Sequence, residues 1–109
     1  MKLELDAQTK PISARVHSDA VVVSTVADGI DLLGNASYLG AKRIVAQKAH
    51  FADDFFDLKT GLAGEILQKF SNYRMRLTIE GEWQEINSRA LRDFIRECNR
   101  GEAIEFLSV

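Results

Sequence analysis

The sequence predicts an α/β fold in which about three helices cover a mixed β-sheet that begins with an N-terminal hairpin. Short alternating or β-branched segments recur along the 109 residues, and amphipathic segments with helical spacing separate them. Glycines and capping residues stand at the boundaries. Strands that alternate with helices pair at least partly in parallel, through right-handed crossovers. At this length, a single domain over residues 1–109 is expected.

The strands are predicted from alternation and from β-branched composition. Residues 3–5 and 12–17 alternate on either side of a polar turn and are expected to form the hairpin. The run AVVVST, from Ala20 to Thr25, is continuous and β-branched, as expected for the end of a strand or a covered strand segment. The remaining predicted strands are RIVAQ (43–47), RMRLTIEGE (74–82) and AIEFLSV (103–109).

Three amphipathic helices are predicted between these strands. Ser24 or Thr25 is expected to cap the first helix, which ends at Gly40, and Asn87 or Ser88 is expected to cap the third. Apolar side chains at helical spacing should face the sheet. They are Val26, Ile30 and Leu33 in the first helix, Leu62, Ile66, Leu67, Phe70 and Tyr73 in the second, and Leu91, Phe94, Ile95 and Cys98 in the third.

The composition argues against several classes of function. The 14 basic residues face 16 acidic ones, a balance that argues against nucleic acid as a partner. The longest apolar run, from Ala20 to Val23, is too short to span a membrane, and the first ten residues do not resemble a signal peptide. A cytoplasmic location is therefore expected, which suits a chain with Cys98 as its only cysteine.

Few residues suggest chemistry. His17 and His50 have no partner at a metal-ligand spacing, and Cys98 falls on an apolar helix face, where it is expected to be a core residue. Trp83 is expected in a loop, either exposed as a partner anchor or folded back onto the sheet. No catalytic residue, cofactor or metal is predicted.

The segment FFDLKTGLAGEILQKF, residues 55–70, differs from the rest of the chain. Asp57 is positioned to cap a helix, and a magnesium site built from Asp53, Asp54 and Asp57 is the alternative interpretation.

Thr60 precedes two glycines that stand within four residues, at positions 61 and 64. The glycines suggest either tight packing of the helix on the sheet or close approach of a partner. An exposed hydroxyl at a helix N-terminus is also a favourable place to receive or bind phosphate.

Two resemblances follow from these residues. DDFFDLKTGLAGEILQKFSNYRMRLTIEGEW and SRALRDFIRECNRG resemble a bacterial family catalogued as a domain of unknown function, over Val16 to the C-terminus. The order of elements is also similar to STAS domains, the fold of bacterial anti-anti-sigma factors. In those proteins a Ser in an Asp-Ser-Ser-Gly-Leu-Gly type segment is phosphorylated by a partner kinase.

Thr60-Gly61-Leu62-Ala63 matches the Ser-Gly-Leu-Gly part of that segment, with Asp57 one residue further away than in the pattern. The resemblance implies a non-enzymatic regulatory domain that binds a protein partner, with Thr60 as the candidate phosphoacceptor. The candidate binding surface comprises Asp53, Asp54, Phe55, Phe56, Asp57, Lys59 and Gly61. The alternative is a small-ligand or nucleotide-binding module at the same helix start, and a third hypothesis is a homodimer formed through an exposed sheet edge.

Overall fold

A five-stranded sheet forms the centre of the molecule. The computed structural model describes residues 1–109, and the strands lie in the order β1-β2-β3-β4-β5. They are β1 (Lys2–Asp6), β2 (Ser13–His17), β3 (Arg43–Gln47), β4 (Arg76–Gly81) and β5 (Ile104–Ser108). The pair β1–β2 is antiparallel, whereas β2 through β5 are parallel. The predicted mixed α/β sheet with an N-terminal hairpin is thus confirmed.

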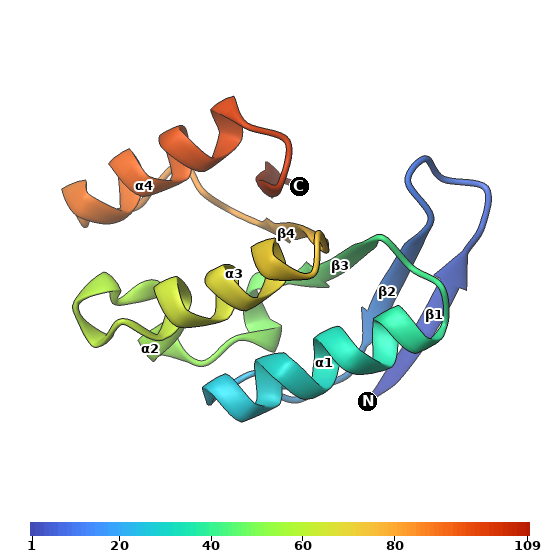
Figure 1. Ribbon diagram of the computed structural model, residues 1–109. Helices are drawn as coiled ribbons and strands as arrows, with labels where there is room; N and C mark the ends of the chain where they lie inside the picture. The colour runs from blue at the N-terminus through green and yellow to red at the C-terminus, as the bar shows by residue number, and fades with distance from the viewer.

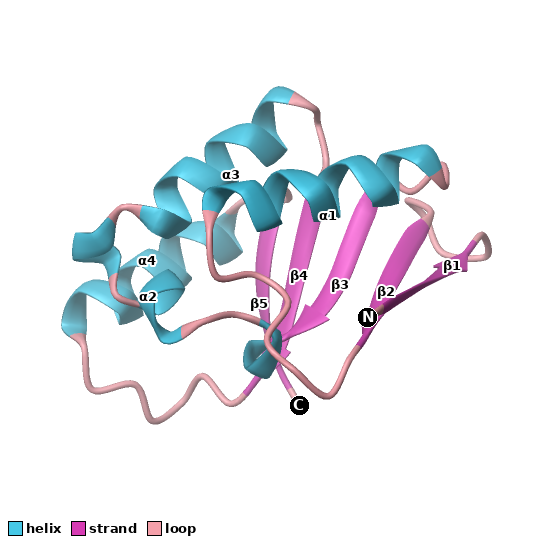
Figure 2. Cartoon of the chain, turned by 90° about the horizontal axis from the view of Figure 1, so that it is seen from below, coloured by secondary structure: helices cyan, strands magenta, loops and turns pink.

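The longer helices lie on one face of this sheet (Figures 1 and 2). The helical segments are α1 (Val26–Tyr38), η1 (Lys48–His50), α2 (Asp53–Phe56), η2 (Leu58–Thr60), α3 (Leu62–Asn72) and α4 (Arg89–Arg100). Because parallel crossovers are right-handed and the strands follow in sequence order, each crossover helix returns over the same face. The short segments η1, α2 and η2 were not predicted. No helix is long and apolar enough to cross a bilayer.

The hydrophobic core lies between the sheet and these helices. Ile44 and Ile79 in the central strands are fully buried, and Leu77 is almost so. They pack with Leu32 of α1 and with Ile66 and Phe70 of α3. Alternation along β4 had predicted the inward direction of Met75, Leu77 and Ile79, and all three are buried.

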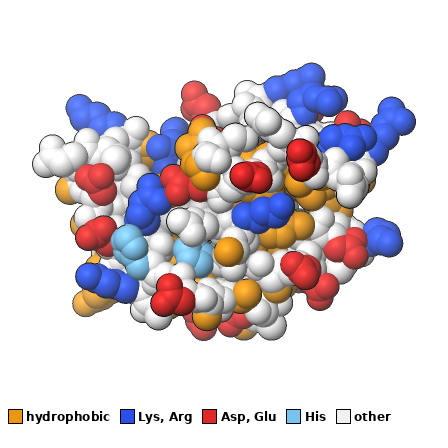
Figure 3. Space-filling model, turned by 180° about the vertical axis from the view of Figure 1, so that it is seen from behind, with side chains coloured by type: hydrophobic (Ala, Val, Ile, Leu, Met, Phe, Trp, Pro, Cys, Tyr) orange, Lys and Arg blue, Asp and Glu red, His pale blue; other side chains and the backbone are white.

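The opposite face of the sheet carries polar and charged side chains. In Figure 3, which shows the molecule from behind, Lys and Arg side chains are interspersed with Asp and Glu side chains over the surface. Arg15 of β2 reaches across β3 to the Glu80 carboxylate with two hydrogen bonds, of 2.8 and 3.2 Å. The hydrogen bond to Glu80 raises the pKa of the Arg15 guanidinium, while desolvation opposes the shift.

The predicted strand at Ala20–Thr25 is wrong. This segment is a loop with one isolated bridge, between Val23 and Phe51. The N–H groups of Val22 and Val23 donate to the carbonyl oxygen of His50 at 2.7 and 3.0 Å. Since β3 already pairs with β2, the segment has no free position in the sheet and instead crosses its end.

Two predicted inward-facing side chains point to solvent. Ile30 is 45% exposed and Tyr73 is 70% exposed. The buried residues of α1 are Gly29, Leu32, Leu33 and Ala36, so the prediction is confirmed for Leu33, and Gly29 takes the inward position predicted for Ile30. A Cβ atom at Gly29 would lie 3.0 Å from the Ile66 side chain, so α1 lies close against α3 at this glycine.

The predicted helix caps are present. Thr25 caps α1, because its Oγ1 accepts the Asp28 N–H at 3.1 Å, and Ser88 caps α4 by accepting the Leu91 N–H. The Asp28 carboxylate in turn accepts the N–H groups of Ser24 and Thr25, which completes a capping box. The bond from Ser24 is the main influence that lowers the pKa of the Asp28 carboxyl.

Thr25→Ala should lower the free energy of unfolding by about 0.5–2 kcal/mol, because the Asp28 N–H loses its acceptor. Chemical denaturation measures the change. Ser24→Ala is the matched control, since Ser24 contributes only its backbone N–H to the box. Equal losses in the two variants would show that the Thr25 hydroxyl is not the cap.

Candidate functional site

The largest hollow lies at the carboxyl-terminal ends of the central parallel strands. This groove has a volume of about 910 Å³ and is bounded by the ends of β3 and β4, by η1 and α2, and by the loop that carries Val21. In open parallel sheets this edge is where ligands usually bind, because the loops after the strands converge there. Its lining residues are Val21, Gln47, Lys48, Ala49, Phe51, Ala52, Asp53, Phe56, Glu80, Gly81, Glu82 and Val109.

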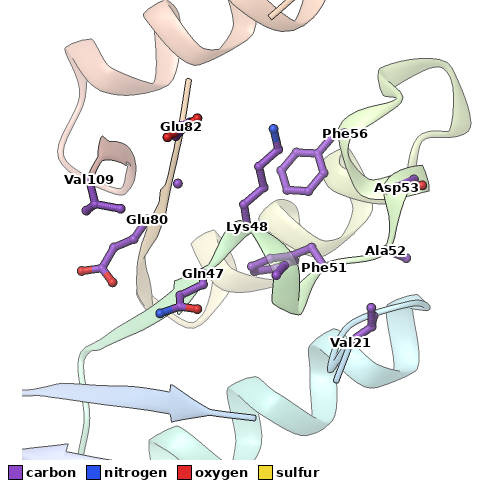
Figure 4. Close-up of a pocket in the computed structure, with 12 residues that line it drawn as sticks. Val21, Gln47, Lys48, Phe51, Ala52, Asp53, Phe56, Glu80, Glu82 and Val109 are labelled. Atoms are coloured by element: carbon purple, nitrogen blue, oxygen red, sulfur yellow. The ribbon is translucent and has the colours of Figure 1, made fainter. Parts of the chain in front are cut away.

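Lys48 is the central cation of the groove. Its side chain extends between the Phe56 ring and the β4 segment that carries Glu80 and Glu82 (Figure 4). The ammonium lies 5.0 Å from the Trp83 ring centroid and 6.0 Å from that of Phe56. The attraction between the ammonium and these two rings favours this position of the side chain. No carboxylate lies within ion-pair distance of the Lys48 ammonium.

Gly81 makes room for Lys48. A Cβ atom at position 81 would lie 2.9 Å from the Lys48 Cβ and 3.2 Å from the Trp83 ring. The first contact is to an atom next to the backbone, so a side-chain rotation cannot relieve it. The wall of the groove therefore depends on a glycine at the end of β4.

His50 is buried and holds together two of the segments that bound the groove. It is 3% exposed, and its Nδ1 accepts the Gln47 N–H at 3.0 Å. Its Nε2 therefore carries the proton and donates to the Ser18 carbonyl oxygen at 3.0 Å. The ring thus ties the end of β3 to the loop after β2, which places Val21 beside the groove.

Aromatic side chains connect the groove to the core. Trp83 is 8% exposed, and its indole N–H is shared between the carbonyl oxygens of Ile79 and Leu107, each at 3.2 Å. Of the two interpretations of Trp83, folding back onto the sheet is confirmed. Phe56 is half-buried and packs against Trp83, with ring centroids 5.6 Å apart.

Phe55 does not belong to the binding surface. It is 1% exposed and packs against Phe51 at a centroid distance of 4.6 Å, so it is a core residue. The short helix α2 turns adjacent side chains to different sides, which sends Phe55 inward and leaves Phe56 at the rim. Both residues were candidates for the binding surface if exposed, with the core as the alternative, and for Phe55 the core alternative is confirmed.

The Thr60 hydroxyl joins three segments next to the groove. The residue is exposed, and Oγ1 shares its proton between the carbonyl oxygens of Asp54 at 2.7 Å and Asp57 at 2.9 Å. The same oxygen accepts the N–H of Leu62, the first residue of α3, at 3.2 Å. We call this set of bonds the Thr60 clasp. It connects α2, η2 and α3.

The two glycines after Thr60 are not packing devices. Gly61 has φ of +78°, a left-handed conformation that favours glycine, and it lets the chain turn from η2 into α3. A Cβ atom at Gly61 or Gly64 would meet nothing within 4 Å. The interpretation that these glycines pack the helix on the sheet is wrong, and Gly64 presents open backbone to solvent.

The acidic residues of this segment have separate positions. Asp57 accepts the Lys59 N–H at 3.3 Å and is a cap at the predicted position, but it caps the short segment η2, and α3 begins only at Leu62. Asp53 and Asp54 occupy the first turn of α2, and Asp53 also lines the groove. No group of three or more His, Cys, Asp or Glu side chains is arranged to hold a metal ion. The three aspartates therefore do not form the magnesium site considered as the alternative interpretation.

A second, smaller hollow adjoins the groove. It is lined by Asp53 and Phe56, which it shares with the groove, and by Lys59 and Ser88 among others. Its volume is about 430 Å³. Asp53, Phe56, Asp57 and Lys59 of the predicted surface therefore lie along one continuous stretch, while Thr60 and Gly61 follow at its end.

The other chemically interesting residues lie away from this region. Cys98 of α4 is half-buried, and desolvation, with Glu97 nearby, raises the pKa of its thiol. Its thiolate is therefore disfavoured, as expected for a packed cysteine. His17 lies on the open face of the sheet, where Nε2 is 3.1 Å from the Glu4 carboxylate.

Comparison with known protein families places the chain in one family. A family model described as "Domain of unknown function (DUF4180)" matches residues 8–109. The chain belongs to this family. The match extends further toward the N-terminus than the resemblance noted from Val16 onward. No curated protein and no solved structure matches the chain.

Sequence reasoning missed most of the DUF4180 groove. Gln47, Lys48 and Glu80–Glu82 were assigned to strands or passed over, although each stands at the end of a predicted parallel strand. That position was the available signal, because the carboxyl ends of neighbouring parallel strands meet at one edge.

Gly81→Ala should lower the free energy of unfolding by about 1–3 kcal/mol, because the added methyl group displaces Lys48 and Trp83. Trp83 fluorescence and thermal denaturation measure the change. Gly64→Ala is the matched control and should instead stabilise α3, by up to about 1 kcal/mol, because its Cβ meets no neighbour. A Gly81→Ala variant as stable as the wild type would contradict the close packing described here.

Proposed function

We propose that this DUF4180 domain is a bacterial regulatory domain with a STAS-like architecture that acts by binding another protein. The contact surface consists of the segment from Asp53 to Gly61 and the adjoining groove. Thr60 is the switch, and its phosphorylation changes the shape of this surface. The observation that carries the proposal is the Thr60 clasp, in which one exposed hydroxyl holds three segments together.

The order of elements supports the STAS-like part of the proposal. An antiparallel hairpin is followed by parallel strands whose connecting helices cover one face (Figure 2). Thr60 lies between the central strand β3 and the helix α3, where anti-anti-sigma factors carry their phosphorylated serine. The matching residues are Thr60, Gly61, Leu62 and Ala63.

The chemistry of the Thr60 clasp explains how phosphorylation would act. A phosphate ester has no hydroxyl proton, so it can no longer donate to the carbonyl oxygens of Asp54 and Asp57. It also adds about −1.5 to −2 charges beside these carbonyl dipoles and the Asp57 carboxylate. The α3 dipole attracts the phosphate, worth about 0.3–1 kcal/mol, but the lost bonds and the repulsion oppose it. The segment should therefore detach from the start of α3.

Movement of α2 and η2 would change the binding surface directly, because Phe56 belongs both to α2 and to this surface. Phe56 lines both the groove and the smaller hollow, and it is the half-buried apolar side chain nearest the Thr60 clasp on α2. When α2 and η2 shift, Phe56 shifts with them and the Lys48 ammonium loses one of its rings. Gly64 leaves open backbone on α3 for a partner that approaches the same region.

Thr60→Glu should open the segment, because Glu introduces charge and removes the hydroxyl donor. Hydrogen exchange at the Thr60 and Gly61 amides, which bond to Asp57 and Leu58, should be faster than in the wild type. Affinity capture should lose the partner protein that the wild type retains. Thr60→Ser keeps the hydroxyl and should preserve both properties, and Ser71→Glu places the same charge at the other end of α3. Unchanged exchange and unchanged capture in Thr60→Glu would refute the proposal.

A second candidate function is supported by the groove. Its volume of about 910 Å³ falls within the roughly 300–1,000 Å³ of small-molecule sites, and it lies at the carboxyl ends of parallel strands. The Lys48 ammonium, over an apolar floor, suits an anionic ligand such as a nucleotide. In this alternative the ligand site moves from the predicted helix start to the groove, since the Leu62 N–H is already bonded to Thr60.

Thermal denaturation with a panel of nucleotides, with and without magnesium, separates the two functions. A groove ligand at one hundred times its Kd would stabilise the protein by about 2.7 kcal/mol and raise Tm by roughly 10 °C. Lys48→Met should remove that rise. A flat panel, together with loss of the partner in Thr60→Glu, excludes the ligand function in favour of protein binding.

A further inference from the structure

The two edges of the sheet differ in how they are protected. At the β5 edge, Asn99 of α4 bonds to the outward backbone groups of Phe106. Its Oδ1 accepts the Phe106 N–H at 2.7 Å, and its Nδ2 donates to the Phe106 carbonyl oxygen at 3.1 Å. The Asn99 amide thus imitates a neighbouring strand and blocks the middle of β5. No side chain is bonded to the backbone of β1 between Lys2 and Leu5.

The strand β1 alternates charged and apolar residues, so one of its faces is charged and the other is apolar. Lys2, Glu4 and Asp6 stand beside His17, Arg15 and Ser13 on the open face of the sheet. Leu3 and Leu5 point to the helix side, where Leu5 remains 41% exposed. An exposed leucine on an unprotected edge is a feature that a further strand would cover.

The sequence KLELD of β1 is complementary to itself in the antiparallel direction. When two copies align about Glu4, Lys2 of each copy faces Asp6 of the other, and Leu3 faces Leu5. Both ionic pairs lie on the charged face and both leucine pairs lie on the helix side, as the alternation of strands requires.

The two Glu4 residues meet on the axis of this arrangement, and their charges already have partners. Each Glu4 carboxylate lies 3.1 Å from His17 Nε2 and near enough to Arg15 to help raise the pKa of that guanidinium. The like-charge contact at the centre is therefore offset by the Arg15 guanidinium on the neighbouring strand β2 within each copy, and each Glu4 carboxylate also lies within hydrogen-bond distance of His17.

We propose that β1 pairs with β1 of a second copy of this chain, antiparallel and in the register that sets Lys2 opposite Asp6. A two-fold axis perpendicular to the sheet relates the copies, so the contact is closed and stops at a dimer. The two sheets join into one of ten strands, with the helices of both copies on the same face. The unprotected edge of each copy is covered by the other. This inference is independent of the proposed function, because the Thr60 clasp and the groove lie elsewhere.

Charge reversal in β1 tests the dimer and its register. The wild type should be a dimer by size-exclusion chromatography with light scattering. In Lys2→Glu each ionic pair becomes two acids, and in Asp6→Lys each becomes two lysines. Each single variant should weaken the dimer by roughly tenfold or more. The double variant Lys2→Glu/Asp6→Lys restores both pairs and should dimerise again.

Mixing the single variants provides a test that misfolding cannot imitate. In a complex of Lys2→Glu with Asp6→Lys, both ionic pairs are again opposite in sign. Native mass spectrometry should therefore show that the mixture forms heterodimers more readily than either single variant forms homodimers. Lys69→Glu, the same charge change at an exposed site on α3, should leave the wild-type dimer intact.

Three results would overturn the proposal. A wild type that is monomeric at every concentration at which it stays dissolved would exclude the dimer. A dimer insensitive to both single variants would place the interface elsewhere. A dimer lost in Lys2→Glu but retained in Asp6→Lys would exclude this register, because an alignment about Leu3 leaves Asp6 unpaired.

Discussion

The parallel pairing of β2 to β5 in sequence order is the constraint on which the rest of the structure depends. Because every crossover is right-handed and leads to the adjacent strand, α1, α3 and α4 all return over one face. Ile44, Leu77 and Ile79 are therefore sealed beneath helices. The other face has no helix and carries charged side chains, of which Arg15 and Glu80 form a two-bond pair across β3.

The same constraint places the candidate site. All four parallel strands end at one edge, so the loops after β2, β3 and β4 must meet there. His50 joins two of these loops through Gln47 and Ser18, and Gly81 allows Lys48 to lie across the end of β4. The segment that follows, held by the Thr60 clasp, forms the far rim. The site is thus built on a buried histidine and a glycine whose roles are structural, while Lys48 and Phe56 line the groove and Thr60 is exposed.

The two edge strands of the sheet, β1 and β5, differ in how their outward backbone groups are covered. The helix α4 returns close enough to β5 for Asn99 to satisfy the outward groups of Phe106. No helix follows the hairpin on its outer side, so β1 depends on β2 alone for pairing within one copy. The family match begins at residue 8 and so includes β2 onward, whereas β1 precedes it. The β1 edge therefore lies outside the matched residues, whereas all the residues that line the groove lie within them.

The sequence by itself determined the local structure of this protein. Alternation located β1 to β5, apolar spacing located α1, α3 and α4, and Thr25 and Ser88 are caps because a cap requires only a hydroxyl three residues from an N–H. The predicted role of Thr60 also rested on a local motif and remains a prediction; the structure shows that the residue is exposed.

Only the tertiary structure decided the remaining features, because they depend on residues far apart in the chain. Ala20–Thr25 has strand composition, but the position beside β2 is taken by β3, so it became a loop. The phase of α1 follows from the contact of Gly29 with Ile66, which excludes Ile30 from the core. Phe55 is buried by Phe51, and Trp83 by carbonyl groups of two strands. Neighbours in sequence set periodicity and caps, whereas burial and the groove are set by which distant segments meet.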